Sequence, residues 1–309
     1  MCCLFGMLDS ENRFSGKEKS GMISILAAAC EARGTDAAGI AYPYDGRLCI
    51  YKRPLPAHKL HPRIPNGTRV VMGHTRLTTQ GSEKHNYNNH PFPGRAGDTS
   101  FALAHNGVLY NDRALRRTHR LPGTRIETDS YIAVQLLEQK RALDFSSLKD
   151  MAEQVEGSFA FTVLDDRENL YFVKGDNPLC LYHFPRTGVY LYASTEEILK
   201  CALARLRLRL GPHERIRLEA GDILRINAGG VPMRSDFRFV CDYTPWCFKG
   251  LYSPQKSSRS GLCTPEQEYL GELKAVASSF GYAPEDIDAL LLRGFSTDEL
   301  EEFLYCGEL

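Results

Sequence analysis

The sequence predicts a mixed α+β protein that ends in a small helical extension. Between residues 157 and 193, short apolar runs alternate with turn residues, a pattern typical of β-strands. Further upstream, apolar residues at helical spacing predict a helix over residues 20–33. Beyond residue 262, two capping-box patterns and intervening glycines predict short helices.

The bulk composition narrows the classes of function. The chain has 309 residues, enough for one large domain with an appendage or for two domains. Lys plus Arg and Asp plus Glu both number 38, so the net charge of zero gives no electrostatic reason to expect a nucleic-acid or membrane-surface partner. No apolar run approaches the roughly 18 residues of a membrane span. The N-terminus also lacks the features of a signal peptide, so we expect a cytoplasmic protein.

The cysteines do not form a recognisable metal site. Ten cysteines are scattered along the chain without a CxxC pair or the paired spacing of a zinc site. Cys241 and Cys247 could be half of such a site, but no matching His/Cys pair follows them. We expect neither a metal nor a cofactor, and most thiols should be buried as small hydrophobic groups.

Cys2 is the candidate nucleophile. If Met1 is removed, a thiol and a free α-amine share one residue, and the amine can accept the thiol proton as the sulfur attacks. A free α-amine has a pKa of about 7.7–8.0, close enough to neutrality for this role. Most cysteines at position two are inert, so the other segments of the chain must support this interpretation.

The first part of the chain alternates between predicted strands and turns. The run from Cys2 to Gly6 is of strand type, and further strands are predicted over residues 46–53 and 70–72. The segment from Arg33 to Ala41 is rich in small residues, which allow close backbone approach. A tight turn between the helix over 20–33 and the next strand is the plainer explanation of that composition.

Two polar groups stand at the ends of predicted strands. Arg76 lies among small hydroxyl residues and could hold a carboxylate through two parallel hydrogen bonds, or form a surface salt bridge. Asn106 and Gly107 follow the predicted strand 101–104. Their amides could converge on an oxyanion, although Asn-Gly is also a common hairpin turn.

An acidic residue precedes the next helix. Apolar positions predict a helix over residues 130–140, and Asp129 should fall in its first turn. There it could stabilise the helix start or receive a substrate ammonium group.

The middle of the chain is rich in strands. They are predicted over residues 158–164, 170–173, 180–184, 189–193 and 223–226. A helix should begin at residues 194–198. In residues 203–210 leucines alternate with arginines, and this period of two favours a half-exposed strand over a basic binding stripe.

The C-terminal part has a different character. Residues 236–262 are predicted to be a link with aromatic anchors, namely Tyr243, Trp246, Phe248 and Tyr252. Three short helices are predicted over residues 265–280, 284–293 and 297–306. So small a piece rarely holds a core alone, so it should dock on the main domain or on a partner.

Five segments together, in this order, resemble the class II glutamine amidotransferase domain of the N-terminal-nucleophile hydrolases. The markers are Cys2, the Arg-Gly-x-Asp-x-x-Gly segment from Arg33 to Gly39, Gly-His-x-Arg ending at Arg76, His-Asn-Gly ending at Gly107, and Glu-Thr-Asp ending at Asp129. The resemblance covers roughly residues 2–230.

The resemblance implies a four-layer αββα sandwich, which we expect over residues 2–235. The sequence pattern adds the link 236–262 and the three-helix extension 263–309. It implies that Cys2 is the nucleophile and its α-amine the base, with Asn106 and the Gly107 amide forming the oxyanion hole. For substrate binding it implies Arg76 at the α-carboxylate, Asp129 at the α-ammonium group, Thr78 beside them, and Arg33 organising the N-terminus.

Some features depart from the family pattern. Cys3 stands where many members have glycine, Leu77 where an aromatic residue is usual, and Gln80 where histidine or alanine is frequent. Residues 231–309 cannot house the second catalytic domain of the family's synthases. We therefore expect a stand-alone amidohydrolase or the glutaminase subunit of a complex.

Three hypotheses about function remain open. The first is hydrolysis of glutamine through a γ-glutamyl thioester, with ammonia released to an acceptor enzyme on a separate chain. The second is hydrolysis of γ-glutamyl peptides by the same chemistry. The third is an inactive domain that binds or regulates a partner. The helical extension could bind an acceptor enzyme or form a homo-oligomer.

Overall fold

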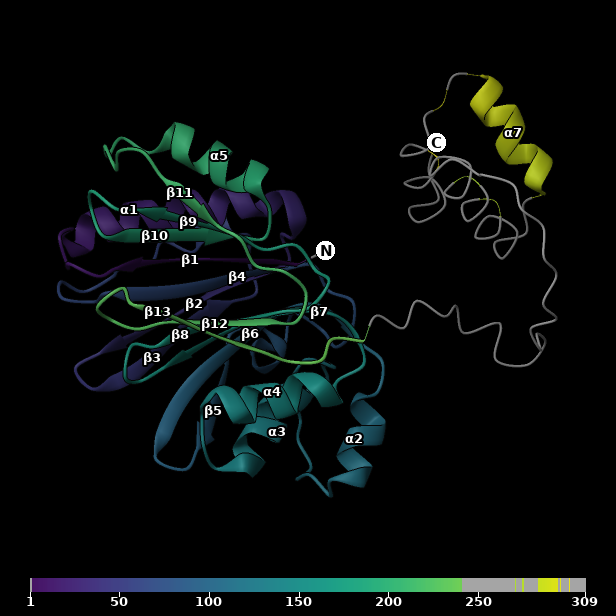
Figure 1. The fold of residues 1–309 in the computed structure, drawn as a ribbon, viewed down its shortest axis with the longest axis horizontal. Coiled ribbons are helices and arrows are strands. Elements are labelled where there is room, and N and C mark those ends of the chain that lie inside the picture. Colours follow the sequence, from purple (N-terminus) through teal and green to yellow (C-terminus); the bar gives the residue numbers. More distant parts are fainter. Residues whose placement is uncertain are drawn as a thin grey trace. The chain divides into compact units, whose positions relative to one another are not determined.

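Two antiparallel β-sheets form the centre of the N-terminal part of the chain (Figure 1). The structure, a computed structural model, describes residues 2–240, 270, 274, 283–293, 295 and 300. It contains two compact units, Met1–Tyr243 and Thr244–Leu309, and each is considered by itself. Among the described residues, no helix has the length and apolar character needed to cross a bilayer.

The first sheet has the strand order β11-β9-β10-β1-β4-β2-β3. Its strands are β1 (Cys3–Asp9), β2 (Ala37–Tyr44), β3 (Arg47–Arg53), β4 (Val70–Arg76), β9 (Cys180–Phe184), β10 (Val189–Ala193) and β11 (Glu214–Ile216). β1 lies near the middle, between β4 and β10, and all its residues are buried. Its nearly continuous apolar sequence follows from burial on both faces.

The second sheet has the strand order β13-β12-β8-β7-β6-β5. Its strands are β5 (Phe92–Ala96), β6 (Thr99–Leu109), β7 (Gly157–Asp165), β8 (Leu170–Lys174), β12 (Asp222–Ile226) and β13 (Pro232–Asp236). The strands predicted between residues 158 and 226 coincide with β7, β8, β9, β10 and β12 to within about one residue. β5 and β13 were not predicted.

Helices cover the outer faces of both sheets, which gives the four layers expected from the resemblance (Figure 1). The helices are α1 (Gly16–Ala29), α2 (Asp112–Thr118), α3 (Tyr131–Lys140), α4 (Phe145–Gln154) and α5 (Glu196–Arg205), with the 3₁₀ turn η1 (Cys30–Arg33) after α1. α1 and α5 share a hydrophobic core with the first sheet, and α3 and α4 share one with the second. A third core, which includes Leu4, Met72 and Phe172, fills the space between the sheets.

Helix α1 begins four residues before the predicted start. Ser15 caps it in a capping box with Glu18. The next polar residue, Lys19, is fully buried, and its Nζ lies 3.0 Å from Asp9 Oδ2. A buried ion pair gives no apolar signal, so the sequence pattern concealed the first turn.

The strand predicted over residues 203–210 is wrong. Residues 203–205 complete α5, and residues 206–210 form no strand. The alternation in burial is nevertheless real, because Leu206, Leu208 and Leu210 pack on the first core while Arg207 and Arg209 are exposed. A period of two indicates an extended backbone. It does not show that a neighbouring strand is present to pair with it.

The second unit is described in part. α7 (Pro284–Leu292) coincides with the middle predicted helix, and Ile287 and Leu300 are buried in a cluster of apolar side chains. Most residues of the other two predicted helices, and the aromatic anchors of the link, lie outside the described residues. At the start of the link, Phe237 is buried, with its ring centroid 6.0 Å from that of Phe159.

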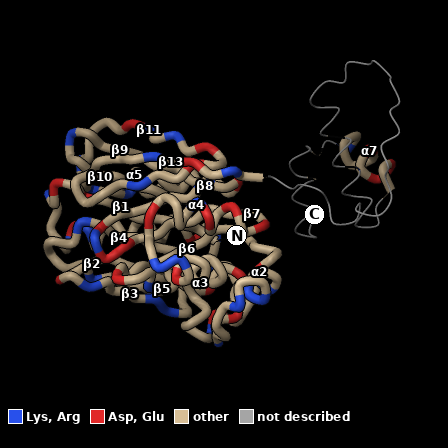
Figure 2. The backbone as a smooth tube through the Cα atoms, turned by 60° about the horizontal axis from the view of Figure 1, so that its bottom comes forward, with Lys and Arg blue, Asp and Glu red and all other residues tan. Residues whose placement is uncertain are grey.

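Charged residues of both signs are interspersed along the described backbone (Figure 2). This distribution agrees with equal totals of 38 basic and 38 acidic residues.

Candidate active site

The first strand places Cys2 at one end of the first sheet. β1 begins at Cys3, which pairs with Thr75 on β4. The half-buried Cys2 thiol lies 3.5 Å from the Leu77 carbonyl oxygen, to which it donates. Arg33 Nε donates to the Cys2 carbonyl oxygen at 3.0 Å. Two neighbouring segments therefore hold the main chain and the side chain of Cys2.

The surroundings of Cys2 keep its thiol protonated at neutral pH. Burial raises the pKa of the Cys2 thiol, and this effect outweighs the lowering by the hydrogen bond to Leu77 and the charge of Arg76. The charge of Asp129 raises the same pKa further. Attack by this sulfur consequently requires a base. Arg76 and Asp129 both lie close enough for their charges to shift the pKa of the thiol.

Arg76 is a buried cation whose hydrogen-bond partners are all uncharged in the described part of the chain. It ends β4 and is only 3% exposed. Its guanidinium donates to Asn89 Oδ1 at 2.7 Å, to the Gln80 carbonyl at 2.6 Å and to the Gly81 carbonyl at 3.0 Å. Burial lowers the pKa of Arg76 because the charged form is poorly solvated. An anionic ligand would stabilise this buried positive charge by pairing with it.

Two glycines of the Arg-Gly-x-Asp-x-x-Gly segment allow the chain to pass close to the backbone of Arg76 and of His90. A Cβ on Gly34 would lie 2.5 Å from the Arg76 carbonyl carbon, and one on Gly39 would lie 2.3 Å from the His90 carbonyl oxygen. In both cases the obstacle is backbone, so no side-chain rotation could relieve it. The small residues seen in the sequence therefore have a structural reason beyond the turn.

The loop after Arg76 carries Thr78. Asp36 Oδ2 accepts the Thr78 backbone N–H at 2.7 Å, which fixes this loop to the start of β2. The Thr78 hydroxyl is buried and has no partner in the described part of the chain. Of the departures from the family pattern, Leu77 is 42% exposed and Gln80 contributes its backbone carbonyl to Arg76.

Asp129 lies before the helix rather than in its first turn. Ser130 is the N-cap of α3, so the predicted position of Asp129 inside the helix is wrong. The carboxylate is 4% exposed, and its Oδ2 accepts the Leu109 N–H at 2.6 Å. This hydrogen bond fixes Asp129 to the end of β6, where it carries a buried negative charge.

Asn106 and Gly107 lie inside β6, not after a strand end as predicted. They pair with Ala160 and Phe159 on β7. Gly107 has φ of 138°, and a Cβ there would lie 1.8 Å from the Ser158 carbonyl oxygen, so only glycine fits. Asn106 is 1% exposed, and its Nδ2 donates to Ser194 Oγ at 3.4 Å.

Three buried histidines lie together beside this part of β6. His74 Nε2 donates to the His105 carbonyl oxygen at 2.9 Å, directly before Asn106. His105 Nδ1 lies 2.8 Å from Ser130 Oγ, and the His90 ring centroid lies 4.2 Å from that of His74. Burial lowers the pKa of all three, that of His74 to about 3, so they are neutral at neutral pH.

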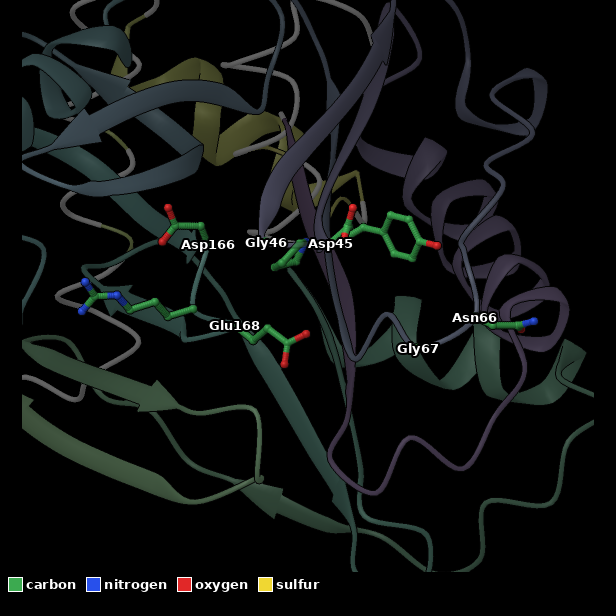
Figure 3. Close-up of a pocket in the computed structure, with 9 residues that line it drawn as sticks. Asp45, Gly46, Asn66, Gly67, Asp166 and Glu168 are labelled. Atoms are coloured by element: carbon green, nitrogen blue, oxygen red, sulfur yellow. The ribbon is translucent and has the colours of Figure 1, made fainter.

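Two surface hollows differ in their relation to these residues. One, of about 250 Å³, includes Arg33, Gly34 and Leu77 in its lining and adjoins Cys2. The other, of about 420 Å³, is lined by turns that carry Asp45, Asp166 and Glu168 (Figure 3). The strand register places it at the opposite ends of β2 and β7 from the site. Within the described residues, no cluster of three or more His, Cys, Asp or Glu could hold a metal ion.

The structure thus gathers most of the residues singled out in the sequence. A hydrogen bond joins Arg33 to Cys2, and another fixes the loop that carries Thr78. The charges of Arg76 and Asp129 both act on the Cys2 thiol. Asn106 and Gly107 join them through β6, whose Leu109 N–H binds Asp129.

Four supporting residues were missed. Asp36 and His74 stand inside the quoted markers, so the markers themselves could have suggested them. Asn89 gave no such signal, and Ser194 stood only at a predicted helix start.

The comparisons with known proteins agree with this geometry. Residues 74–201 match the family model described as a glutamine amidotransferase domain. Glutamine–fructose-6-phosphate aminotransferase (isomerizing) of Chlamydia trachomatis is 30% identical over 190 residues, which cover 59% of this chain and 30% of the relative. The enzyme of that name from Bacillus cereus is 32% identical over 158 residues, or 48% of this chain and 26% of the relative. The chain therefore spans less than a third of the length of these relatives.

A solved structure shares the fold. The glutamine phosphoribosylpyrophosphate amidotransferase of B. subtilis, complexed with ADP and GMP, superposes with a TM-score of 0.61 at 20% identity, over 77% of this chain and 49% of that one. The family match, the two-sheet sandwich and the order of the markers lead to one assignment. Residues 74–201 match the glutamine amidotransferase domain family, and the chain shares the fold of the B. subtilis amidotransferase.

Proposed function

We propose that this domain hydrolyses the side-chain amide of glutamine through a γ-glutamyl thioester on Cys2. The products are glutamate and ammonia. The observation that carries the proposal is the pair of buried opposite charges, Arg76 and Asp129, which both act on the Cys2 thiol.

These two charges fit the two ends of an α-amino acid. The Arg76 guanidinium has uncharged hydrogen-bond partners, so a substrate α-carboxylate would give it a counter-charge. The Asp129 carboxylate would do the same for the α-ammonium group. The Thr78 hydroxyl, which has no partner among the described residues, offers a further hydrogen bond beside Arg76. A substrate bound at both ends would present its side-chain amide to Cys2.

In the first half of the reaction, the Cys2 sulfur attacks the amide carbon. The α-amine of Cys2, freed by removal of Met1, takes the thiol proton that burial otherwise retains. Negative charge develops on the amide oxygen, where Asn106 Nδ2 and the Gly107 N–H would donate. The carbon–nitrogen bond then breaks, the α-ammonium group returns the proton to the leaving nitrogen, and ammonia departs.

In the second half, water cleaves the thioester. The α-amine takes a proton from the water as it attacks, and the same donors stabilise the second oxyanion. The carbon–sulfur bond breaks, glutamate leaves, and the sulfur regains its proton.

The ammonia is proposed to serve an acceptor enzyme on a separate chain. The curated relatives are named as aminotransferases that act on glutamine and fructose 6-phosphate, and this supports nitrogen transfer as the use of the reaction. In this proposal, residues 2–235 form the catalytic domain and residues 236–262 form a link. Residues 263–309 dock on that domain, on a second copy or on the acceptor.

Paired substrate assays test the proposal. The purified chain should release ammonia from glutamine in preference to free amine from γ-glutamyl peptides, with Cys2→Ala as the inactive control. The reverse preference would replace glutamine by γ-glutamyl peptides as the substrate. Silence in both assays would favour a partner-binding or regulatory module.

A further inference from the structure

Ser194 connects the nucleophile strand to the residue proposed to stabilise the oxyanion. It directly follows β10, at the point where the backbone pairing of β10 with β1 ends at Ala193 and Phe5. Its side chain is fully buried, and its Oγ accepts the Leu4 N–H at 2.9 Å. The hydroxyl therefore continues the ladder by one hydrogen bond, two residues from Cys2.

The same oxygen also accepts a hydrogen bond from the other sheet. Asn106 Nδ2, on β6, donates to Ser194 Oγ at 3.4 Å. An asparagine amide carries two N–H groups on one planar nitrogen. A hydrogen bond to one N–H fixes the plane of the amide and hence the direction of the second N–H.

Among the described residues, the neighbouring hydrogen bonds hold the backbone on either side of the Asn106 amide group. Asn106 pairs with Ala160 through the ladder, and His74 Nε2 binds the preceding carbonyl of His105. Neither contact involves the Asn106 amide group. Ser194 is thus placed to set its orientation relative to a sulfur on the other sheet.

We propose that Ser194 is a positioning residue that aligns the Asn106 amide with the Cys2 sulfur. The inference rests on the proposed glutamine hydrolysis, in which Asn106 donates to the oxyanion. Misalignment should affect the transition state more than the bound ground state, since only the former carries the negative charge. A misaligned donor still stabilises the oxyanion in part. The fall in kcat should therefore be smaller than the roughly 10²–10³-fold typical of a deleted donor.

The kinetic test is a double-mutant cycle. Ser194→Ala should lower kcat for glutamine about tenfold with little change in KM, while Asn106→Ala gives the larger loss. In the double variant, loss of Ser194 should have no further effect. If the two losses multiply, or if Ser194→Ala leaves kcat unchanged, Ser194 does not act through Asn106. Restoration of kcat by Ser194→Thr would show that the hydroxyl is the group required.

A matched control separates positioning from general stability. Ser147 is a buried serine whose Oγ accepts the Asp144 N–H at 3.0 Å, on the far side of the second sheet. Ser147→Ala removes a comparable acceptor and should lower the melting temperature without changing kcat. An equal fall of kcat in both variants would overturn the assignment.

A spectroscopic measurement distinguishes failure of this inference from failure of the proposed function. Nuclear magnetic resonance of the Asn106 side-chain amide should show a rigid group in the unaltered chain and a more mobile one in Ser194→Ala. This readout does not depend on turnover. Equal rigidity in both proteins would refute the inference whatever the activity. An ordered amide in a chain without glutaminase activity would instead refute the proposed function.

Discussion

The neutral histidine cluster behind the site predicts a steep loss of stability in mild acid. Burial, reinforced by the positive charges of Arg76 and Lys52, lowers the pKa of His74 to about 3. In the unfolded chain a histidine has a pKa of about 6.5. Between these values the unfolded state binds the extra proton, so the free energy of unfolding falls as the pH falls.

The size of the effect follows from these two values. Between pH 7 and pH 5, proton uptake by the unfolded state should lower the free energy of unfolding by roughly 2 kcal/mol through His74 alone. His90 and His105 are buried in the same cluster with their pKa values lowered as well, so they add to this loss in the same direction. Folded domains are typically stable by only about 5–15 kcal/mol, so this loss would be easy to measure.

A single substitution isolates one member of the cluster. Both ring nitrogens of His90 are buried and have no hydrogen-bond partner among the described residues, and the ring lies between His74 and Phe92. His90→Phe therefore removes no hydrogen bond to the described residues and should change stability little at pH 7. At pH 5 the variant should have a higher free energy of unfolding than the original chain, because one protonation site has been removed from the unfolded state.

Urea unfolding at pH 7, 6 and 5 measures both quantities, with the slope m as a check that the same surface unfolds. The reasoning is refuted if the stability of the original chain does not fall over this range. It is also refuted if His90→Phe shows the same dependence on pH as the original chain.

Three further outcomes are expected. Arg76→Ala should chiefly raise KM, since it removes a contact made in the ground state as well, whereas Asn106→Ala should lower kcat by about 10²–10³-fold; equal effects on both parameters in both variants would contradict these roles. Cys3→Ala should retain activity but lose about 1–2 kcal/mol of stability, because Cys3 is fully buried in the core of the first sheet; loss of turnover in a folded variant would give Cys3 a role in seating Cys2. Deletion of residues 263–309 should leave the site intact but expose apolar surface or abolish a stable association; an unchanged stability, oligomeric state and partner binding would exclude the docking role.

The sequence predicted the elements of the fold better than their arrangement. Short apolar runs between turn residues located β7 to β10 closely, because each strand is buried and bounded by turns. The pairing of β1 with β4 and β10 joins residues far apart in the chain, and no local pattern encodes it. The four-layer arrangement was expected only from the family resemblance. The alternation over residues 203–210 misled because burial alternates without a partner strand.

The residues proposed for the site were predictable where their chemistry is distinctive, and their supports were not. A thiol at position two, an arginine among small residues and an Asn-Gly pair each indicate a function in the sequence. Asn89 and Ser194 act through their places in space, as an acceptor for Arg76 and an acceptor for Asn106. Their contacts depend on tertiary packing, which composition and spacing do not show.

The central claim is that the free α-amine of Cys2 serves as the base for its own thiol. The most direct test compares glutaminase activity in two forms of the chain, one that begins at Cys2 and one that keeps Met1, with intact mass verifying each N-terminus. Burial raises the pKa of the thiol, so without a neighbouring amine it should stay protonated and unreactive. The account predicts turnover of glutamine only in the form that begins at Cys2. Full activity with Met1 attached would contradict it.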